Sequence, residues 1–202
     1  MQTPYTTHEL NLLLKKPNLK TCSFTEYRDW VIINYLLATA NRVKTIINIQ
    51  IGDLDLEDNS VLLRHMKNGR QKSLPLSSSI AKILSEYLKY RKGEPEDYLF
   101  CSRYGQKLTR NALEHSIKKY NLRRGVTKTA IHHFRNTFAI IYLENGGDSK
   151  KLQAILDHST SEMVDQYVDL LQLDLKKDFD KVNPLELFVR EQYNKMPIRM
   201  VK

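Results

Sequence analysis

The chain has 202 residues, of which 41% are hydrophobic and 27% charged, so it is long enough to bury the core of one well-packed domain. Lysine and arginine outnumber aspartate and glutamate by 32 to 23, and the formal net charge of +9 favours a polyanionic partner. No apolar run approaches the roughly 20 residues of a membrane helix and no signal-peptide pattern is present, so we expect a soluble cytoplasmic protein that does not contact a membrane.

The first quarter of the chain predicts two helices. Thr6 or Thr7 can cap a helix of about ten residues, which Pro17 stops. A longer helix is predicted over residues 25–39, with an apolar face broad enough for a central position in the core. Cys22 and Cys101 lie far apart and lack the spacing of zinc ligands, so we expect two reduced thiols and neither a disulfide nor a metal site.

Short β-prone runs follow Gly52, at residues 53–56, 60–66 and 71–76. Asn68-Gly69 predicts a tight hairpin turn between the last two runs. This hairpin is basic, and its candidate DNA contacts are Arg64, Arg70 and Lys72, with Lys67 reaching furthest beside the turn. A protruding basic ribbon has a good shape for entering a DNA groove. The alternative is a solvated edge strand whose lysines prevent strand pairing.

Two more helices are predicted next, over residues 77–91 and from a cap at Thr109 through Tyr120. The loop that follows is basic, and its candidate DNA contacts are Arg123, Arg124 and Lys128.

The following helix, which Gly146-Gly147 ends, has apolar residues at three- and four-residue intervals that predict one buried face: Ile131, Phe134, Phe138 and Ile141. His132 and Arg135 are three residues apart, so their side chains rise from the same side of this helix. Both residue types bind phosphate.

Two further segments complete the pattern. Asp148 or Ser149 can cap a helix that leaves His158 at its exit, and an S-x-x-E capping box at Ser159 begins a short helix that carries Tyr167. Short connections keep such helices adjacent, so these residues can converge on one surface. Taken singly, either histidine can be a core or capping residue, and Tyr167 can be a half-buried packing residue.

In order and spacing, the chain resembles the catalytic domain of the tyrosine recombinase (phage integrase) family from about residue 3 to residue 180. The motifs are TANR with Arg42, MKNGR with Lys67, HHFR with His132 and Arg135, LDH with His158, and DQYV with Tyr167. Five ordered motifs are far more specific than any one of them. Three positions depart from the family pattern: Ala40 stands where glycine is common, Thr45 replaces an acidic residue, and Asp157 replaces a glycine. Alanine suits the first of these positions only if the backbone there needs no positive φ.

The resemblance implies an α+β fold, mainly helical, with a small three-stranded antiparallel sheet or β-hairpin. It implies a site-specific recombinase or integrase in which Tyr167 is the nucleophile and forms a 3′-phosphotyrosyl bond to DNA. The catalytic set would be Arg42, Lys67, His132, Arg135, His158 and Tyr167, acting without metal, ATP or cofactor.

The partners implied are double-stranded DNA and other protomers, in a tetrameric synapse associated with the nucleoid. Residues 1–180 would form the catalytic domain. Residues 181–202 would form a tail helix that docks either on its own domain or on a neighbouring protomer. Two alternatives for the function are a type IB topoisomerase-like nicking and closing enzyme and a DNA-binding module with reduced activity.

Overall fold

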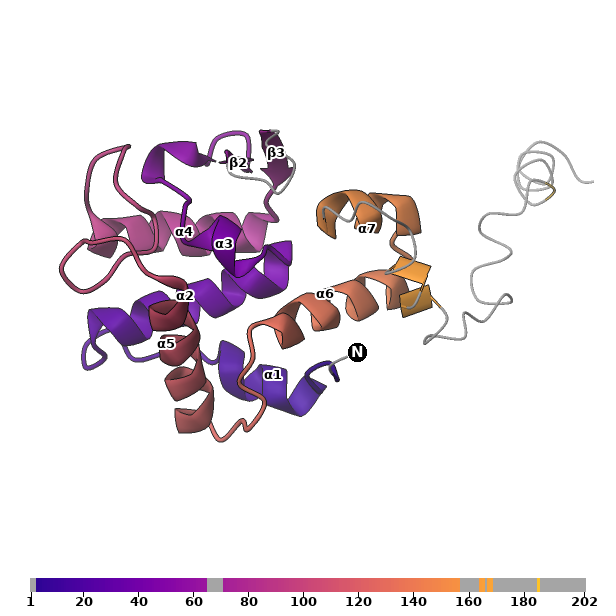
Figure 1. The fold of residues 1–202 in the computed structure, drawn as a ribbon, viewed down its shortest axis with the longest axis horizontal. Helices are drawn as coiled ribbons and strands as arrows, with labels where there is room; N and C mark the ends of the chain where they lie inside the picture. Colours follow the sequence, from indigo (N-terminus) through magenta and orange to yellow (C-terminus); the bar gives the residue numbers. More distant parts are fainter. Residues whose placement is uncertain (1–2, 65–70, 157–163, 166, 169–184, 186–202) are drawn as a thin grey trace, which may run out of the picture.

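Helix α2 (Phe24–Thr39) is the centre of the fold. The computed structural model describes residues 3–64, 71–156, 164–165, 167–168 and 185. In it, α2 contacts four other helices: α1 (Thr7–Leu14), α4 (Ser78–Arg91), α5 (Arg110–Arg123) and α6 (His132–Glu144). Figure 1 shows these helices arranged around it. Because α2 is covered on several sides, most of its apolar side chains are buried, as its broad apolar face predicts, although Leu37 is only partly buried.

Side-chain caps fix where several helices begin. Thr6 accepts a hydrogen bond from the backbone of Glu9, whose carboxylate accepts one from the backbone of Thr6, so α1 begins with a complete capping box. Ser23 and Thr109 cap α2 and α5 in the same way, through the amides three residues on. The helix starts expected from the sequence are therefore confirmed to within one or two residues.

A three-stranded antiparallel sheet lies beside the helices in the order β1-β2-β3. Its strands are β1 (Leu54–Asp55), β2 (Ser60–Leu63) and β3 (Lys72–Pro75), and a 3₁₀ turn (Ile51–Asp53) precedes them. Val61, Leu63 and Leu74 turn inward and join the core around α2. The mainly helical α+β fold with a small antiparallel sheet is thus confirmed, and the turn at residues 65–70 lies outside the described residues.

Helix α6 joins this core to a second, smaller one. Phe134 packs in the cluster around α2, whereas Ala139 and Leu143 pack with residues of α7 (Ser149–Leu156) and with Tyr167. Figure 1 shows α6 extending from the helices around α2 toward α7.

The apolar face predicted for α6 was partly wrong. Ile131 and Phe134 are buried, but Ile141 is 37% exposed and Phe138 only partly buried. The fully buried positions of this helix instead include Arg135, Asn136 and Thr137, three polar residues in succession. A helix that bridges two cores buries different sides along its length, so one apolar stripe does not describe it.

The N-terminal segment is tied directly to α6. The backbone amide of Tyr5 donates to Thr137 Oγ1 at 2.8 Å, and Nδ1 of His133 lies 2.7 Å from the carbonyl oxygen of Thr3. The side chain of Tyr5 packs against Phe134. The start of the described chain therefore supports the helix that carries the H-x-x-R motif.

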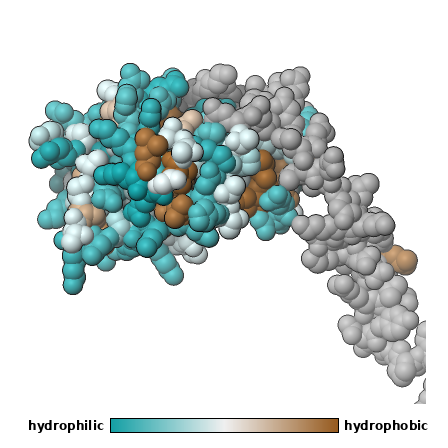
Figure 2. Space-filling view, turned by 90° about the horizontal axis from the view of Figure 1, so that it is seen from below, coloured by the Kyte–Doolittle hydropathy of each residue, from teal (hydrophilic) through white to brown (hydrophobic). Residues whose placement is uncertain are grey.

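On the side drawn in Figure 2 the surface is mainly hydrophilic, with apolar residues in small separate patches.

Candidate active site

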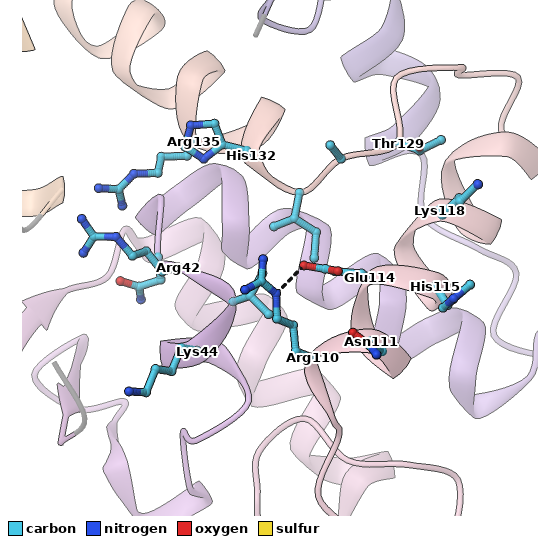
Figure 3. A pocket seen from close by; sticks show the side chains of 14 residues that line it. Arg42, Lys44, Arg110, Asn111, Glu114, His115, Lys118, Thr129, His132 and Arg135 are labelled. Atoms are coloured by element: carbon cyan, nitrogen blue, oxygen red, sulfur yellow. Dashed lines mark hydrogen bonds and ion pairs between the residues drawn. The ribbon is translucent and has the colours of Figure 1, made fainter. Parts of the chain in front are cut away.

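A basic cavity of about 670 Å³ lies between the end of α2, the start of α6 and the exposed side of α5. Three residues of the predicted catalytic set line it, Arg42, His132 and Arg135 (Figure 3). Its rim also carries Lys44, Arg110 and Lys118, against one carboxylate, Glu114. Five cationic side chains and one carboxylate give this cavity a positive charge, which attracts the phosphates of a polyanion.

A tight backbone turn after α2 positions Arg42. Ala40 ends α2 in left-handed backbone with φ of 52°, and Arg42 then begins the short helix α3 (Val43–Ile46). Between them, Asn41 Nδ2 donates a 2.9 Å bond to the hydroxyl of Tyr35, which is fully buried in α2. The position of Ala40 therefore does need positive φ, which explains why glycine suits it better than the alanine present here. Helix α3 was not foreseen from the sequence.

Arg135 is held by two backbone carbonyls, one at the end of α2 and one at the end of α7. Its Nη1 donates to the carbonyl of Ala40 at 2.7 Å, and its Nη2 donates to the carbonyl of Leu156 at the end of α7. The residue is 5% exposed. A guanidinium is planar and its donors have a fixed geometry, so these two bonds set the orientation of the group.

His132 opens α6 on the exposed side of the same cavity. Partial burial lowers the pKa of its imidazole below the ordinary value of 6.5, and the positive charges of Arg135, His133 and Arg42 lower it further. The neutral imidazole is therefore the main form at neutral pH. Neutral histidine has one donor and one acceptor nitrogen, so it can exchange a proton with a reacting group.

Tyr167 lies behind this cavity and does not line it. Its side chain is 1% exposed, within the second core, and its hydroxyl donates a 2.9 Å hydrogen bond to Oδ1 of Asn136. Burial raises the pKa of the phenol, and the charge of Arg135 acts in the opposite direction. The structure thus brings Tyr167 next to the H-x-x-R helix, but not onto the surface of the cavity on which the sequence analysis expected it.

The two remaining predicted catalytic residues, Lys67 and His158, lie outside the described residues, as does Arg70. Asp157, the departure in the LDH motif, also lies outside them. Their roles stay predictions.

The other predicted DNA contacts lie away from the basic cavity, and most have partners within the fold. Arg64 pairs with Asp53, and Lys72 donates to the carbonyl of Ala154. Arg124 lies over the ring of Tyr120 and 3.7 Å from Glu26.

Lys128 bonds the carbonyl of Pro4 at 2.8 Å and the carboxylate of Glu9 at 2.9 Å, so it anchors the N-terminal segment. Arg123 is exposed beside a smaller cavity of about 380 Å³. Whether any of these residues binds DNA stays a prediction.

Sequence reasoning missed the side of the basic cavity that α5 forms. Arg110, Asn111, His115 and Lys118 recur at intervals of one, three or four residues, so they share one side of this helix. That exposed polar stripe was a usable signal. The apolar residues of the helix predict only its buried side, so they give no indication of this cavity.

Among the described residues, no group of three or more His, Cys, Asp or Glu side chains gathers in a way that suits a metal ion. No helix in the described part of the chain is long and apolar enough to span a membrane. Cys22 and Cys101 are both free thiols.

Known proteins place this fold in one family. Residues 5–173 match the model of the phage integrase family. The chain is 27% identical over 183 residues to tyrosine recombinase XerC of Chlamydia caviae, covering 88% of this chain and 57% of that protein. It is 30% identical over 182 residues to tyrosine recombinase XerD of Staphylococcus haemolyticus, covering 87% of this chain and 61% of that protein. The chain thus spans about three fifths of the length of these relatives.

Solved structures agree with the sequence comparisons. XerA recombinase superposes with a TM-score of 0.71 at 25% identity, over 99% of this chain and 66% of that one. XerH site-specific recombinase bound to a palindromic difH substrate gives a TM-score of 0.68 over 83% of this chain and 50% of that one, and its 22% identity shows the fold alone. With its fold, its basic cavity and its buried tyrosine, the chain belongs to the phage integrase family.

Proposed function

We propose that this chain is the catalytic domain of a site-specific DNA recombinase, which cleaves and rejoins DNA through a 3′-phosphotyrosyl intermediate. The observation that carries the proposal is the grouping of Arg42, His132 and Arg135 around one basic cavity, with Tyr167 bonded to the residue next to Arg135. The matches to XerC and XerD support it, because both are named tyrosine recombinases.

In the proposed reaction, the phenol oxygen of Tyr167 attacks a DNA phosphorus atom and the bond from phosphorus to the 5′ oxygen breaks. At neutral pH only about one free phenol in a thousand is ionised, and burial makes ionisation harder here, so a base must take the proton as attack proceeds. His132, neutral and beside the cavity, is suited to that task. Lys67, in the hairpin turn, would protonate the leaving 5′ oxygen, and His158 would hydrogen-bond the phosphate.

The two arginines stabilise the transition state. Negative charge grows on the nonbridging oxygens as the tyrosine attacks, and a guanidinium stays charged at any relevant pH. Arg135 is fixed by the carbonyls of Ala40 and Leu156, so it need not reorganise when the charge develops. The new phosphotyrosyl bond keeps the energy of the bond that was broken, so a 5′ hydroxyl of another strand can reverse the step.

Double-stranded DNA is the proposed substrate. The cations along α5 and α3 extend the positive surface beyond the reacting phosphate, so they would hold the phosphates that flank it. We also propose that several protomers act together on DNA, as a tetrameric synapse. In that assembly, residues 181–202 dock on a neighbouring protomer.

The test uses nicked duplexes drawn from the DNA that flanks the gene, in which cleavage next to the nick releases a short strand and traps the adduct. A protein-DNA complex that survives SDS is expected with the native chain and absent with Tyr167→Phe. Tyr142→Phe is the matched control, because Tyr142 lies on α6 but packs against Phe138. Adduct formation by Tyr167→Phe, or mapping of the DNA to Tyr142, contradicts the assignment of the nucleophile.

A second assay separates recombination from the topoisomerase alternative. Exchange of strands between two marked sites identifies a recombinase, whereas relaxation of a supercoiled plasmid without exchange identifies a nicking and closing enzyme. Removal of residues 181–202 should abolish coordinated exchange and leave cleavage at a single site intact. Unchanged exchange by the truncated chain contradicts the proposed docking of this segment.

A further inference from the structure

The hydroxyl of Tyr167 is buried, and it lies outside the cavity proposed to bind the DNA phosphate. The side chain is 1% exposed, packed in the small core with Ala139 and Leu143. Its hydroxyl donates to Asn136, which is itself completely buried. The basic cavity, by contrast, is open, and neither Tyr167 nor Asn136 lines it.

Asn136 is well built to keep the tyrosine in this position. It follows Arg135 on α6, so the helix holds its backbone rigidly beside the phosphate-binding guanidinium. Its Oδ1 accepts the phenol proton at 2.9 Å, which is a normal length for a bond from a neutral hydroxyl. An acceptor of this kind favours the phenol over the phenolate, because the phenolate has no proton to donate.

From this geometry we propose that Asn136 is a positioning residue that docks Tyr167 in a buried, neutral and unreactive state, which the tyrosine must leave before it attacks DNA. A buried hydroxyl that loses its partner keeps the cost of its desolvation, so removing the acceptor favours the exposed position. Loss of one ordinary hydrogen bond changes such an equilibrium by roughly three- to tenfold. The docking concerns the free protein, and only its effect on DNA cleavage rests on the proposed function.

Nitration by tetranitromethane measures docking without DNA. The reagent attacks exposed tyrosines through their phenolate, and peptide mapping by mass spectrometry reports each tyrosine separately. In the native chain, Tyr167 should react slowly, as should Tyr35 and Tyr87, which are fully buried in the main core. Tyr104, which is 75% exposed, should react fast and calibrates the reagent.

Asn136→Ala should raise the nitration rate of Tyr167 roughly three- to tenfold while Tyr35 and Tyr87 stay protected. Asn136→Asp keeps an acceptor oxygen at the same position, so Tyr167 should stay protected there. Asn145→Ala is the matched control, since Asn145 caps the exposed end of the same helix and its side chain, among the contacts described, bonds only the carbonyl of Ile141. An unchanged Tyr167 rate in Asn136→Ala, with the core tyrosines protected, overturns the proposal.

If Asn136→Ala destabilises the whole protein, Tyr35 and Tyr87 will be nitrated too. Asn136→Asp is then the variant that tests the proposal. A higher Tyr167 rate in that variant, with the core tyrosines protected, overturns the proposal, and native protection supports it.

On any nicked duplex that the native chain cleaves, Asn136→Ala should form adduct several-fold faster at saturating DNA, with unchanged affinity for the DNA. A rate that falls together with affinity indicates a merely structural role. If no duplex is cleaved by any variant, the proposed function fails while the nitration result still stands.

Discussion

The guanidinium of Arg135 donates a 2.7 Å hydrogen bond to the carbonyl of Ala40, the residue at which α2 ends in left-handed backbone. The left-handed conformation of Ala40 thus has two consequences. It redirects the chain into the segment that presents Arg42, and it aims a carbonyl at Arg135, the second arginine of the candidate site. The turn after α2 is therefore part of the candidate active site.

Ala40→Gly tests how strained this turn is. Left-handed backbone costs a residue other than glycine about 1–2 kcal/mol, whereas losing one buried methyl group costs about 0.8 kcal/mol, so the change should be neutral or slightly stabilising. Ala139→Gly is the control, because Ala139 is equally buried but lies inside α6. There, helix propensity and the lost methyl both oppose the change, so its free energy of unfolding should fall by about 2 kcal/mol. Urea unfolding measures the free energy of unfolding of both variants. Equal losses in the two variants would show that the backbone at Ala40 is not strained.

The pKa of His132 is the second testable quantity. NMR titration of the free protein should place it below the ordinary value, because burial and then Arg135 disfavour the cation. Arg135→Gln should raise it, and Arg42→Gln should raise it less, since Arg42 is the weakest of the four causes. A pKa that does not move when Arg135 is replaced would show that the two side chains do not interact.

The same shift predicts how stability depends on pH. The folded pKa of His132 is lowered, so the unfolded chain takes up the proton first as pH falls. The contribution of His132 is complete above the ordinary value of about 6.5 and is lost as pH falls from there through the lowered pKa of the folded protein. His132→Gln should flatten this part of the profile of unfolding free energy against pH. A profile of unchanged slope would speak against the shift.

A buried ion pair provides a prediction about the main core. Arg28 and Asp29 are 3% and 1% exposed, and Arg28 also donates to the carbonyl of Cys101 and to Ser116. Arg28→Met leaves the carboxylate of Asp29 buried without its charge partner, which should cost about 3–5 kcal/mol. Lys16→Met breaks an exposed pair with Glu86 and a contact of the ammonium with the ring of Trp30, each worth at most about 1 kcal/mol. Denaturant unfolding compares the two variants, and equal costs would contradict the role of burial.

How far sequence reasoning reached can be judged from single elements. The caps at Thr6, Ser23 and Thr109 are local chemistry, since each satisfies an amide three residues away, so most helix starts could be predicted. The order and spacing of the motifs predicted that Arg42, His132 and Arg135 would lie close together, and these three line one cavity. They did not predict that Tyr167 would be buried in the second core, outside that cavity. The burial of Arg135 and Asn136 could not be predicted, because polar residues are expected at the surface and no local pattern shows that a second core covers this part of α6.

Tertiary contacts also changed the expected roles of basic residues. Lys128 lies in a stretch that reads as a solvated basic loop, yet it bonds the carbonyl of Pro4 and the carboxylate of Glu9, more than a hundred residues earlier. No local pattern contains that information. Conversely, Lys44 and Lys118 come from separate helices and line one cavity because α3 and α5 pack against each other.

Lys118 lines the basic cavity, whereas Lys128 is bonded to Pro4 and Glu9, so the two lysines should respond differently to substitution. In the proposed complex, Lys118 faces phosphates across the basic cavity, and each neutralised phosphate contributes about −0.9 to the slope of log K against log salt on duplex DNA. Lys118→Gln should therefore weaken binding to unrelated duplexes about equally and make the slope shallower by about 1. It should leave the free energy of unfolding nearly unchanged, because the side chain is on the exposed side of α5.

Lys128→Gln is the matched change at a basic residue that is tied into the fold. It should lower the free energy of unfolding by roughly 1–2 kcal/mol, because a charge-assisted bond to Glu9 and a bond to a carbonyl are lost. The salt slope should stay close to that of the native chain, since this ammonium is already occupied. Fluorescence anisotropy with a labelled duplex across a salt series gives the slopes, and urea unfolding gives the stabilities. If Lys128→Gln reduced the slope as much as Lys118→Gln did, DNA would also cover the N-terminal side of the molecule, and the basic cavity would not by itself define the path of the DNA.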